Sequence, residues 1–241
     1  MHQVKTLLFD LDGTLLPMDN DHFTRGYFKR LVPRMAHLLP PETFLSQLLK
    51  STDMMVRNND PELTNEQVFK NDFLPAVNGR EEDFWPSIEA FYAGEFGELI
   101  ELSQPTSLAR EICEAALHKG YQLVLATNPL FPRAATEHRM RWAGVEHIPF
   151  AFVTTYENSH FCKPNPNYYQ EMVQKLGVAP ESCMMIGNDA FEDLIAGTLG
   201  MQTYLVTDCL KTGENDLPFT HKGTLADLLN FVRNELPHIE S

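Results

Sequence analysis

The sequence predicts an α/β protein in which helices flank a Rossmann-like parallel sheet of five or more strands and a second, all-helical domain is inserted. Short apolar runs alternate with helical patterns along most of the chain, which is typical of a parallel sheet. About a hundred residues without a comparable run separate the first apolar run from the second, far more than a crossover connection needs. We therefore expect residues 1–17 and 104–241 to form the core, and residues 18–103 to form the inserted helical domain.

Five apolar runs are the candidate strands of this sheet, because short runs of this kind are typical of buried strands. They are Val4–Phe9, Gln122–Ala126, Ala151–Thr154, Cys183–Ile186 and Gln202–Val206.

Capping and glycine signals place helices between the candidate strands. In the core we expect helices at Leu108–Lys119, from Pro132 to Gly144, from Asn165 to Gly177, at Ala190–Leu199 and after Thr224. In the inserted domain, helical patterns cover Asp21–Leu38, Pro41–Val56, Thr64–Val77 and Glu81–Leu99. The letters "TNEQ" at Thr64–Gln67 have the spacing of a capping box, which predicts that a helix begins there.

Composition limits the class of partner. The formal net charge is −14, so the surface is not built to neutralise nucleic acid or an anionic membrane. The four cysteines contain no CxxC pair, which favours buried free thiols over disulfides or a zinc site. The chain shows no apolar leader and no apolar stretch of about 18 residues, so we expect a cytoplasmic protein that acts on a small molecule.

Polar side chains follow four of the expected strands, at the edge where open parallel sheets bind ligands. They are Asp10 and Asp12 after the first strand, Thr127 and Asn128 after the second, Lys163 after the third, and Asn188, Asp189 and Asp193 after the fourth. Clustered acids repel one another unless a cation lies among them, and hard oxygen ligands suit Mg²⁺. A phosphate bound there would need donors, which the Thr127 hydroxyl, the Lys163 ammonium and backbone N–H groups near Gly13 and Asn128 can supply.

Four segments carry a family resemblance: "FDLDGT", "LATN", "KPNP" and "GNDAFED". In this order they resemble the four motifs of the haloacid dehalogenase-like (HAD) hydrolase superfamily. The helical insertion is similar to the cap of the phosphoglycolate phosphatase and β-phosphoglucomutase branch. By contrast, the segment from Thr127 to Lys163 is too short for the other large cap type.

The resemblance implies roles for individual residues. Asp10 would attack phosphorus to give an aspartyl-phosphate, and Asp12 would protonate the leaving alcohol and then activate water. The Asp10 carboxylate, the Asp12 backbone carbonyl and an acid of the fourth motif would hold Mg²⁺. Thr127 and Lys163 would hold the transferring phosphoryl group.

The fourth motif departs from its commonest form, because Asn188 stands where that form has an aspartate. One interpretation makes Asp189 the direct metal ligand, and we favour it at this point. The other keeps Asn188 in the usual place, with Asp189 and Asp193 behind it. Asp189 also has a structural competitor, since Asp189 and Glu192 have the spacing of a capping box.

The sequence thus predicts a Mg²⁺-dependent phosphatase of a small phosphomonoester. A phosphosugar mutase is a close alternative. A phosphonatase is another, which would need a cap lysine such as Lys29, Lys50 or Lys70, and a non-catalytic phosphate-sensing module is a third because of Asn188. A 2-haloacid dehalogenase is disfavoured, since enzymes of that kind lack an acid at the position of Asp12. The sequence specifies neither the alcohol nor the oligomeric state.

Overall fold

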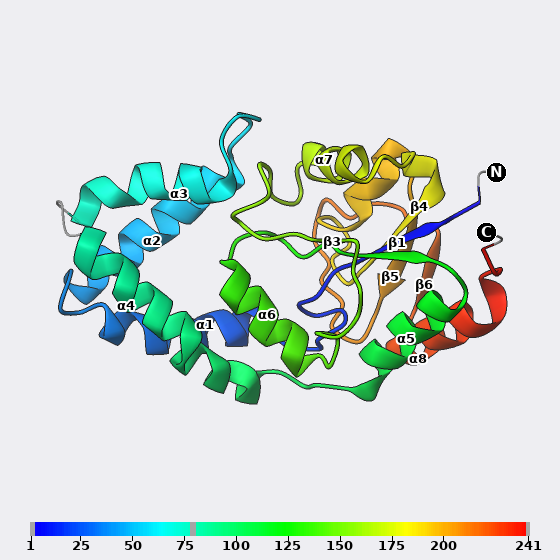
Figure 1. The fold of residues 1–241 in the computed structure, drawn as a ribbon, viewed down its shortest axis with the longest axis horizontal. Coiled ribbons are helices and arrows are strands. Elements are labelled where there is room, and N and C mark those ends of the chain that lie inside the picture. The colour runs from blue at the N-terminus through cyan, green and yellow to red at the C-terminus, as the bar shows by residue number, and fades with distance from the viewer. Residues whose placement is uncertain (1–2, 78–80, 240–241) are drawn as a thin grey trace.

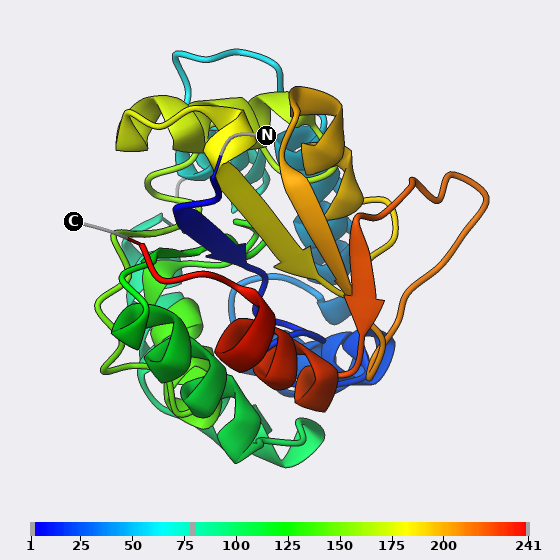
Figure 2. The same ribbon diagram turned by 90° about the vertical axis from the view of Figure 1, so that its right-hand side faces the viewer.

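The structure, a computed structural model, describes residues 3–77 and 81–239 and contains a six-stranded parallel sheet in the order β3-β2-β1-β4-β5-β6 (Figures 1 and 2). The strands are β1 (Thr6–Phe9), β2 (Gln122–Leu125), β3 (Phe152–Val153), β4 (Cys183–Gly187), β5 (Gln202–Val206) and β6 (His221–Gly223). The predicted parallel α/β fold is confirmed, and each expected strand is present, with β3 shorter than its apolar run. The edge strand β6 has the sequence "HKG", which carries no apolar signal.

The helices are α1 (Asn20–Arg34), α2 (Pro41–Val56), α3 (Asn65–Phe73), α4 (Glu81–Ala93), α5 (Ser107–His118), α6 (Arg133–Trp142), α7 (Pro166–Leu176) and α8 (Leu225–Asn230). Shorter helical segments are η1 (Leu74–Val77), η2 (Glu95–Leu102), η3 (Pro180–Ser182), η4 (Leu194–Leu199) and η5 (Phe231–Glu235). The Thr64 capping box is confirmed at the start of α3, and Gly177 ends α7 in the left-handed conformation.

The expected helix at Ala190–Leu199 is wrong in its first half. Residues 190–193 form turns, and a 3₁₀ helix, η4, begins only at Leu194. The backbone of Ala190 is used elsewhere: its N–H donates to Lys211 (2.9 Å), and its carbonyl accepts from Leu217 (2.8 Å). A residue paired in this way cannot also join a helical ladder, so tertiary hydrogen bonds override the local pattern.

Helices cover both faces of the sheet (Figure 2). On one face, Leu8 and Met185 pack in a cluster with Tyr169 and Met172 of α7. On the other face, Leu7 and Phe9 pack in a cluster with Ile112 of α5 and Leu228 of α8. Successive residues of β1 therefore point into two different cores, which explains why this strand is apolar throughout.

The described part of the insertion between β1 and β2 is helical, and it forms the lobe at the left of Figure 1. Its two connections to the core run side by side, because Met18 pairs with Ser103 and Gln104 donates to the Pro17 carbonyl at 2.8 Å. None of the described helices is long and apolar enough to cross a membrane. Cys113, Cys162 and Cys183 are buried free thiols, and Cys209 is a partly exposed one.

The register of the three central strands positions the site. Phe9 at the end of β1 lies opposite Leu125 of β2 and Ile186 of β4. The residues that follow these three strands therefore emerge at the same level of the sheet.

We expect Leu8→Ala to lower the free energy of unfolding by about 2–5 kcal/mol, because it leaves a cavity at the centre of the sheet. Leu8 is fully buried. The matched control is Leu210→Ala, at a leucine that is 37% exposed, and it should change stability by about 0.5 kcal/mol or less. Urea unfolding of both variants measures the difference, and equal losses would contradict this account of the core.

Candidate active site

A cavity of about 200 Å³ opens at the carboxyl edge of the sheet. It is lined by Asp10, Asp12, Met18, Asn20, Phe23, Thr24, Thr127, Asn128, Leu130, Phe131, Asn188, Asp189, Glu192, Asp193 and Lys211. The cavity thus gathers most of the polar residues that the sequence analysis placed after β1, β2 and β4, and α1 of the insertion closes one side. Lys163 does not line it, and lies behind Asp10 instead.

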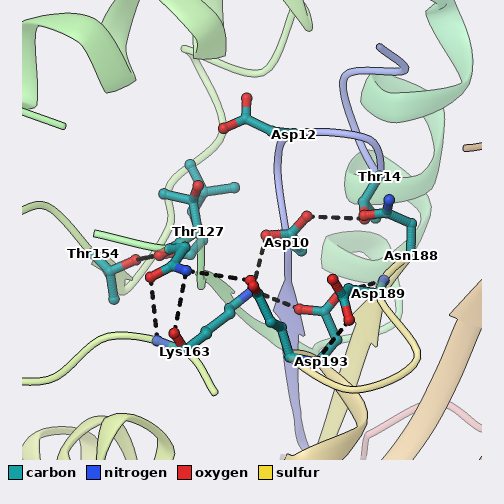
Figure 3. Close-up of polar contacts among 12 residues, drawn as sticks. Asp10, Asp12, Thr14, Thr127, Thr154, Lys163, Asn188, Asp189 and Asp193 are labelled. Atoms are coloured by element: carbon teal, nitrogen blue, oxygen red, sulfur yellow. Dashed lines mark hydrogen bonds and ion pairs between the residues drawn. The ribbon is translucent and has the colours of Figure 1, made fainter. Parts of the chain in front are cut away.

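Lys163 is buried between two carboxylates (Figure 3). Its Nζ atom is 2.8 Å from Asp10 Oδ1 and 2.6 Å from Asp193 Oδ1. The loop after β3 thereby joins the ends of β1 and β4 through a charged cluster. The three residues lie together as the four-strand pattern predicted.

The charges of this cluster depend on one another. Burial raises the pKa of the Asp10 carboxyl, and Lys163 opposes that shift. Burial likewise raises the pKa of Asp193 to about 6, again against the pull of Lys163. Burial alone would lower the pKa of Lys163, but Asp10 and Asp193 hold it well above its ordinary value. Lys163 is therefore a fixed cation at neutral pH, and it neutralises one of the two acids beside it.

Two side-chain oxygens lie close to the Thr14 hydroxyl. This hydroxyl lies 3.1 Å from Asp10 Oδ2 and 3.0 Å from Asn188 Oδ1 (Figure 3). A hydroxyl has one proton, so it fully satisfies only one of these two acceptors at a time. The Asn188 amide is oriented from its other end, where its nitrogen donates to the Cys209 carbonyl at 2.7 Å.

Gly13 is required by this packing. It has a φ of +86°, and a Cβ atom added there would lie 2.5 Å from the Asn188 side-chain nitrogen. Its N–H already donates to the Leu16 carbonyl at 2.9 Å. Gly13 therefore shapes the loop and its own N–H is engaged, while phosphate binding by backbone N–H groups near Gly13 stays a prediction.

The Asp189 carboxylate contacts Lys211 and the backbone of the loop after β4. Its Oδ1 accepts from the N–H groups of Phe191 (2.9 Å) and Glu192 (2.8 Å), and its Oδ2 lies 2.7 Å from Lys211 Nζ. Burial would raise the pKa of Asp189, but these donors outweigh it and hold the pKa below its ordinary value. Oδ1 thus makes the capping contacts foreseen for Asp189, although the Asp189 N–H donates to Asp193 and not to Glu192, and Oδ2 is engaged by Lys211.

Both side-chain oxygens of Asp193 make contacts within the protein. One oxygen contacts Lys163, and the other accepts from the N–H of Asp189 at 2.9 Å. Asp193 is buried, and it ties the loop after β4 to the lysine. Its contacts make it a residue that positions Lys163.

Thr127 is held through its backbone. Its carbonyl accepts from the hydroxyls of Thr154 (2.6 Å) and Tyr168 (2.8 Å), while its side chain lines the cavity. The Asn128 side chain accepts from the backbone N–H of Lys163 at 3.2 Å, so the loops after β2 and β3 are joined beside the cavity.

Asp12 is paired with a buried arginine. Arg139 of α6 donates to Asp12 Oδ2, and its remaining nitrogens donate to the Ala135 carbonyl and the Thr136 hydroxyl, each at 3.2 Å. The guanidinium also lies over the Phe131 ring, 4.7 Å from its centroid. The other Asp12 oxygen, Oδ1, is buried and has no hydrogen-bond partner within residues 3–77 and 81–239.

The oxygen set next to Thr14 fits a hard divalent cation. A carboxylate oxygen of Asp10 and the amide oxygen of Asn188 converge there, and both are ligand types that Mg²⁺ accepts. No three His, Cys, Asp or Glu side chains of the described residues form a metal-binding group. A cation held by the Asp10 carboxylate and the Asn188 amide oxygen would take one carboxylate, which suits an ion that typically keeps several waters.

Several residues of the site were missed by sequence reasoning. Thr14 had a signal, since it follows Gly13 directly within "FDLDGT". Arg139, Tyr168 and Lys211 had none, because each lies in a helix or loop where its residue type is ordinary. Only the packing of α6, α7 and the loop after β5 brings Arg139 to Asp12, Tyr168 to the Thr127 carbonyl and Lys211 to the cavity.

A sequence model described as haloacid dehalogenase-like hydrolase matches residues 4–198. The chain belongs to the haloacid dehalogenase-like hydrolase family. It is 24% identical over 210 residues to pyrophosphatase PpaX of Bacillus cereus, covering 87% of this chain and 86% of that protein. It is 33% identical over 99 residues to glyceraldehyde 3-phosphate phosphatase of Methanothermobacter thermautotrophicus, but that match spans 41% of this chain and only 42% of the relative.

Among solved structures, the fold is similar to a HAD phosphatase from Thermococcus onnurineus. The TM-score is 0.62 at 19% identity, and the match covers 98% of this chain and 100% of that one. The HAD assignment made from the four motifs is thus confirmed, and this chain is a hydrolase of that family.

We expect Arg139→Met to destabilise the protein by somewhat less than the about 3–5 kcal/mol typical of breaking a fully buried ion pair. We expect a smaller loss of stability because the pair is not fully buried. The Asp12 side chain is 22% exposed, whereas that of Arg139 is 1% exposed. The control is Arg141→Met, at an exposed arginine of the same helix. Denaturant unfolding compares the two, and a loss no greater than that of the control would refute the structural role of Arg139.

Proposed function

We propose that this hydrolase is a Mg²⁺-dependent phosphatase of a small phosphomonoester and acts through an aspartyl-phosphate on Asp10. The observation that carries the proposal is the environment of Asp10. It lines the cavity, and its Oδ1 is held by Lys163 while its Oδ2 is held by Thr14. A buried carboxylate fixed in this way is a positioned nucleophile.

In this reaction an Asp10 oxygen forms a bond to phosphorus as the bond from phosphorus to the alcohol oxygen breaks. The Thr127 hydroxyl would bind a phosphoryl oxygen directly, and the Lys163 ammonium, which contacts Asp10 from behind the cavity, would reach a phosphoryl oxygen past the Asp10 carboxylate. Lys163 is well suited to this role because its charge is permanent at neutral pH and because Asp193 fixes its position. Water then attacks phosphorus, releasing phosphate and restoring Asp10.

Asp12 supplies the proton transfers of the proposed reaction. Arg139 holds Asp12 Oδ2, which leaves Oδ1 as the oxygen available to carry a proton. That oxygen would donate its proton to the leaving alcohol and later accept one from the attacking water. Two acids two residues apart therefore have two roles, because Lys163 holds one and Arg139 holds the other.

For the metal, we now favour Asn188 over Asp189. The Asn188 amide oxygen and Asp10 Oδ2 both contact the Thr14 hydroxyl, whereas both Asp189 oxygens are engaged by Lys211 and the loop backbone. The Asp12 carbonyl is the third proposed protein ligand. Bound Mg²⁺ would neutralise charge on the phosphoryl group.

We propose the division into a core of residues 1–17 and 104–241 and a cap of residues 18–103, with the cap closing over the cavity to exclude bulk water. Cap residues Asn20, Phe23 and Thr24 already line the cavity. The substrate would be a small phosphorylated metabolite, and nucleic acid and membrane are not expected partners. We retain the expectation of a cytoplasmic protein.

The phosphonatase alternative loses support from the placement of the cap lysines. Lys50 is paired with Asp72, and Lys70 with Glu66. Neither these two nor Lys29 lines the cavity, whose one lining lysine among the described residues is Lys211 of the core. A mutase would share the proposed chemistry, and the release of inorganic phosphate distinguishes it from a phosphatase.

We expect Asp10→Asn to abolish phosphate release from small phosphomonoesters, because an amide oxygen is a much weaker nucleophile than a carboxylate. The wild type should lose activity in EDTA and regain it with Mg²⁺. Asp21→Asn, at an exposed aspartate of α1, is the control and should retain full activity. Metal-independent turnover, or turnover that survives Asp10→Asn, would reject the mechanism.

We expect Asn188→Ala to raise the Mg²⁺ concentration needed for half-maximal activity more than Asp189→Asn does. Asn188→Asp should retain or lower that requirement, because it replaces an amide oxygen by a carboxylate. Mg²⁺ titrations of the three variants make the comparison. A larger increase in that Mg²⁺ concentration for Asp189→Asn would indicate that Asp189 is the metal ligand.

A further inference from the structure

A second cavity, of about 230 Å³, lies between the inserted helices and the core. It is lined by Thr24, Tyr27, Phe28, Leu48, Leu49, Thr52, Phe69, Phe84, Trp85, Ile88, Tyr92, Leu130, Phe131, Pro132 and Tyr156. Four of the inserted helices, α1 to α4, form its walls, and the loops after β2 and β3 form its base. We call it the apolar cavity.

The described residues that line the apolar cavity carry no charged side chain. Among these residues there is no Asp, Glu, Lys, Arg or His, and their side-chain polar atoms are mainly hydroxyls of threonine and tyrosine. Two of these, from Tyr27 and Tyr92, hydrogen-bond to each other at 2.8 Å. The nearby Lys70 lies over the Trp85 ring, 4.6 Å from its centroid, and is paired with Glu66. The wall therefore offers rings and alkyl groups to an occupant.

The apolar cavity adjoins the catalytic cavity. Thr24, Leu130 and Phe131 line both. A ligand that places its phosphate beside Asp10 therefore has the apolar cavity as its neighbouring space. The size is sufficient for a ring, because an apolar cavity of about 150 Å³ is known to hold benzene.

We propose that the apolar cavity binds the leaving group of the substrate, and that this group is an alcohol bearing an uncharged aromatic ring. The inference rests on the proposed phosphatase function and names its substrate class. Burial of the ring against Trp85, Phe28 and Ile88 removes apolar surface from water, while the phosphate remains in the polar cavity.

The same lining disfavours leaving groups that are charged or rich in hydroxyls. A second phosphate, as in pyrophosphate, would be desolvated without a cation in the apolar cavity. A small polyol would bury hydroxyls against rings with few partners, which costs free energy. This chain should therefore differ in substrate from the relatives named pyrophosphatase and glyceraldehyde 3-phosphate phosphatase.

The test compares 2-phenylethyl phosphate with ethyl phosphate, because both release a primary alcohol and differ chiefly in the ring. With Mg²⁺, we expect kcat/KM to favour 2-phenylethyl phosphate by about tenfold to a hundredfold, the range associated with burying one aromatic side chain. Glycerol 3-phosphate and pyrophosphate should be no better than ethyl phosphate. Equal kcat/KM values for the two alkyl phosphates would overturn the inference.

A matched pair of variants tests the location. Leu49 lines the apolar cavity and is 50% exposed, while Met54 of the same helix is 48% exposed and lies outside the lining. Leu49→Glu should reduce the preference for 2-phenylethyl phosphate over ethyl phosphate about tenfold, because it places a charge in the wall that would contact the ring. Met54→Glu adds the same charge and should preserve the preference. Equal effects of the two variants would place the ring elsewhere and overturn the inference.

Binding without turnover gives an independent readout. The chain has two tryptophans, Trp85 in the apolar cavity and Trp142 packed against Phe96. The non-hydrolysable 2-phenylethylphosphonate should change tryptophan fluorescence, ethylphosphonate should not, and Trp85→Phe should abolish the response. A response that survives Trp85→Phe would contradict the assignment.

The proposed function would fail in a different way. In that case neither alkyl phosphate would release phosphate, and Asp10→Asn would behave as wild type, so the substrate inference would fall with it. Mg²⁺-dependent, Asp10-dependent turnover without preference for the ring would overturn the substrate inference alone.

Discussion

The buried ammonium of Lys163 is the interaction on which the rest of the site depends. It lies within 2.8 Å of Asp10 and 2.6 Å of Asp193, and all three side chains are almost entirely removed from water. Burying charges of this kind is costly unless each has a partner at close range. The loop after β3 must therefore lie between the ends of β1 and β4. This requirement explains the hydrogen bonds that join Asn128 to the Lys163 backbone and Asp193 to Asp189.

Around that charged centre, the core and the inserted helices contribute different kinds of side chain. The core supplies acids, hydroxyls and amides from the ends of parallel strands, where their carbonyl and amide groups are already ordered. The inserted helices contribute mainly aromatic and aliphatic side chains, among them Phe28, Trp85 and Ile88. A polar cavity and an apolar one consequently meet at Leu130 and Phe131, which suits a ligand with one charged end and one apolar end.

The loop after β4 shows how tertiary contacts reassign residues that look equivalent in the sequence. Asn188 and Asp189 are adjacent, and the carboxylate is chemically the better metal ligand. Lys211, which comes from the loop after β5, pairs with Asp189 and draws it away, while the Cys209 carbonyl orients Asn188 toward Thr14. The N–H of Ala190 donates to the Lys211 carbonyl, and its carbonyl accepts from the Leu217 N–H. These two hydrogen bonds prevent the helix that the local pattern favours.

By itself the sequence determined the parallel α/β class, the helical insertion, most element positions and the family, because apolar periodicity, capping residues and short motifs are local properties of the chain. It also placed Asp10, Thr127, Lys163 and Asp193 at strand ends. Only the tertiary structure decided that Asp12 meets Arg139, that Asp189 meets Lys211 and that an apolar cavity adjoins the acids. Those outcomes arise from partners distant in sequence, whose approach depends on the packing of whole elements and leaves no signal in the residues around them.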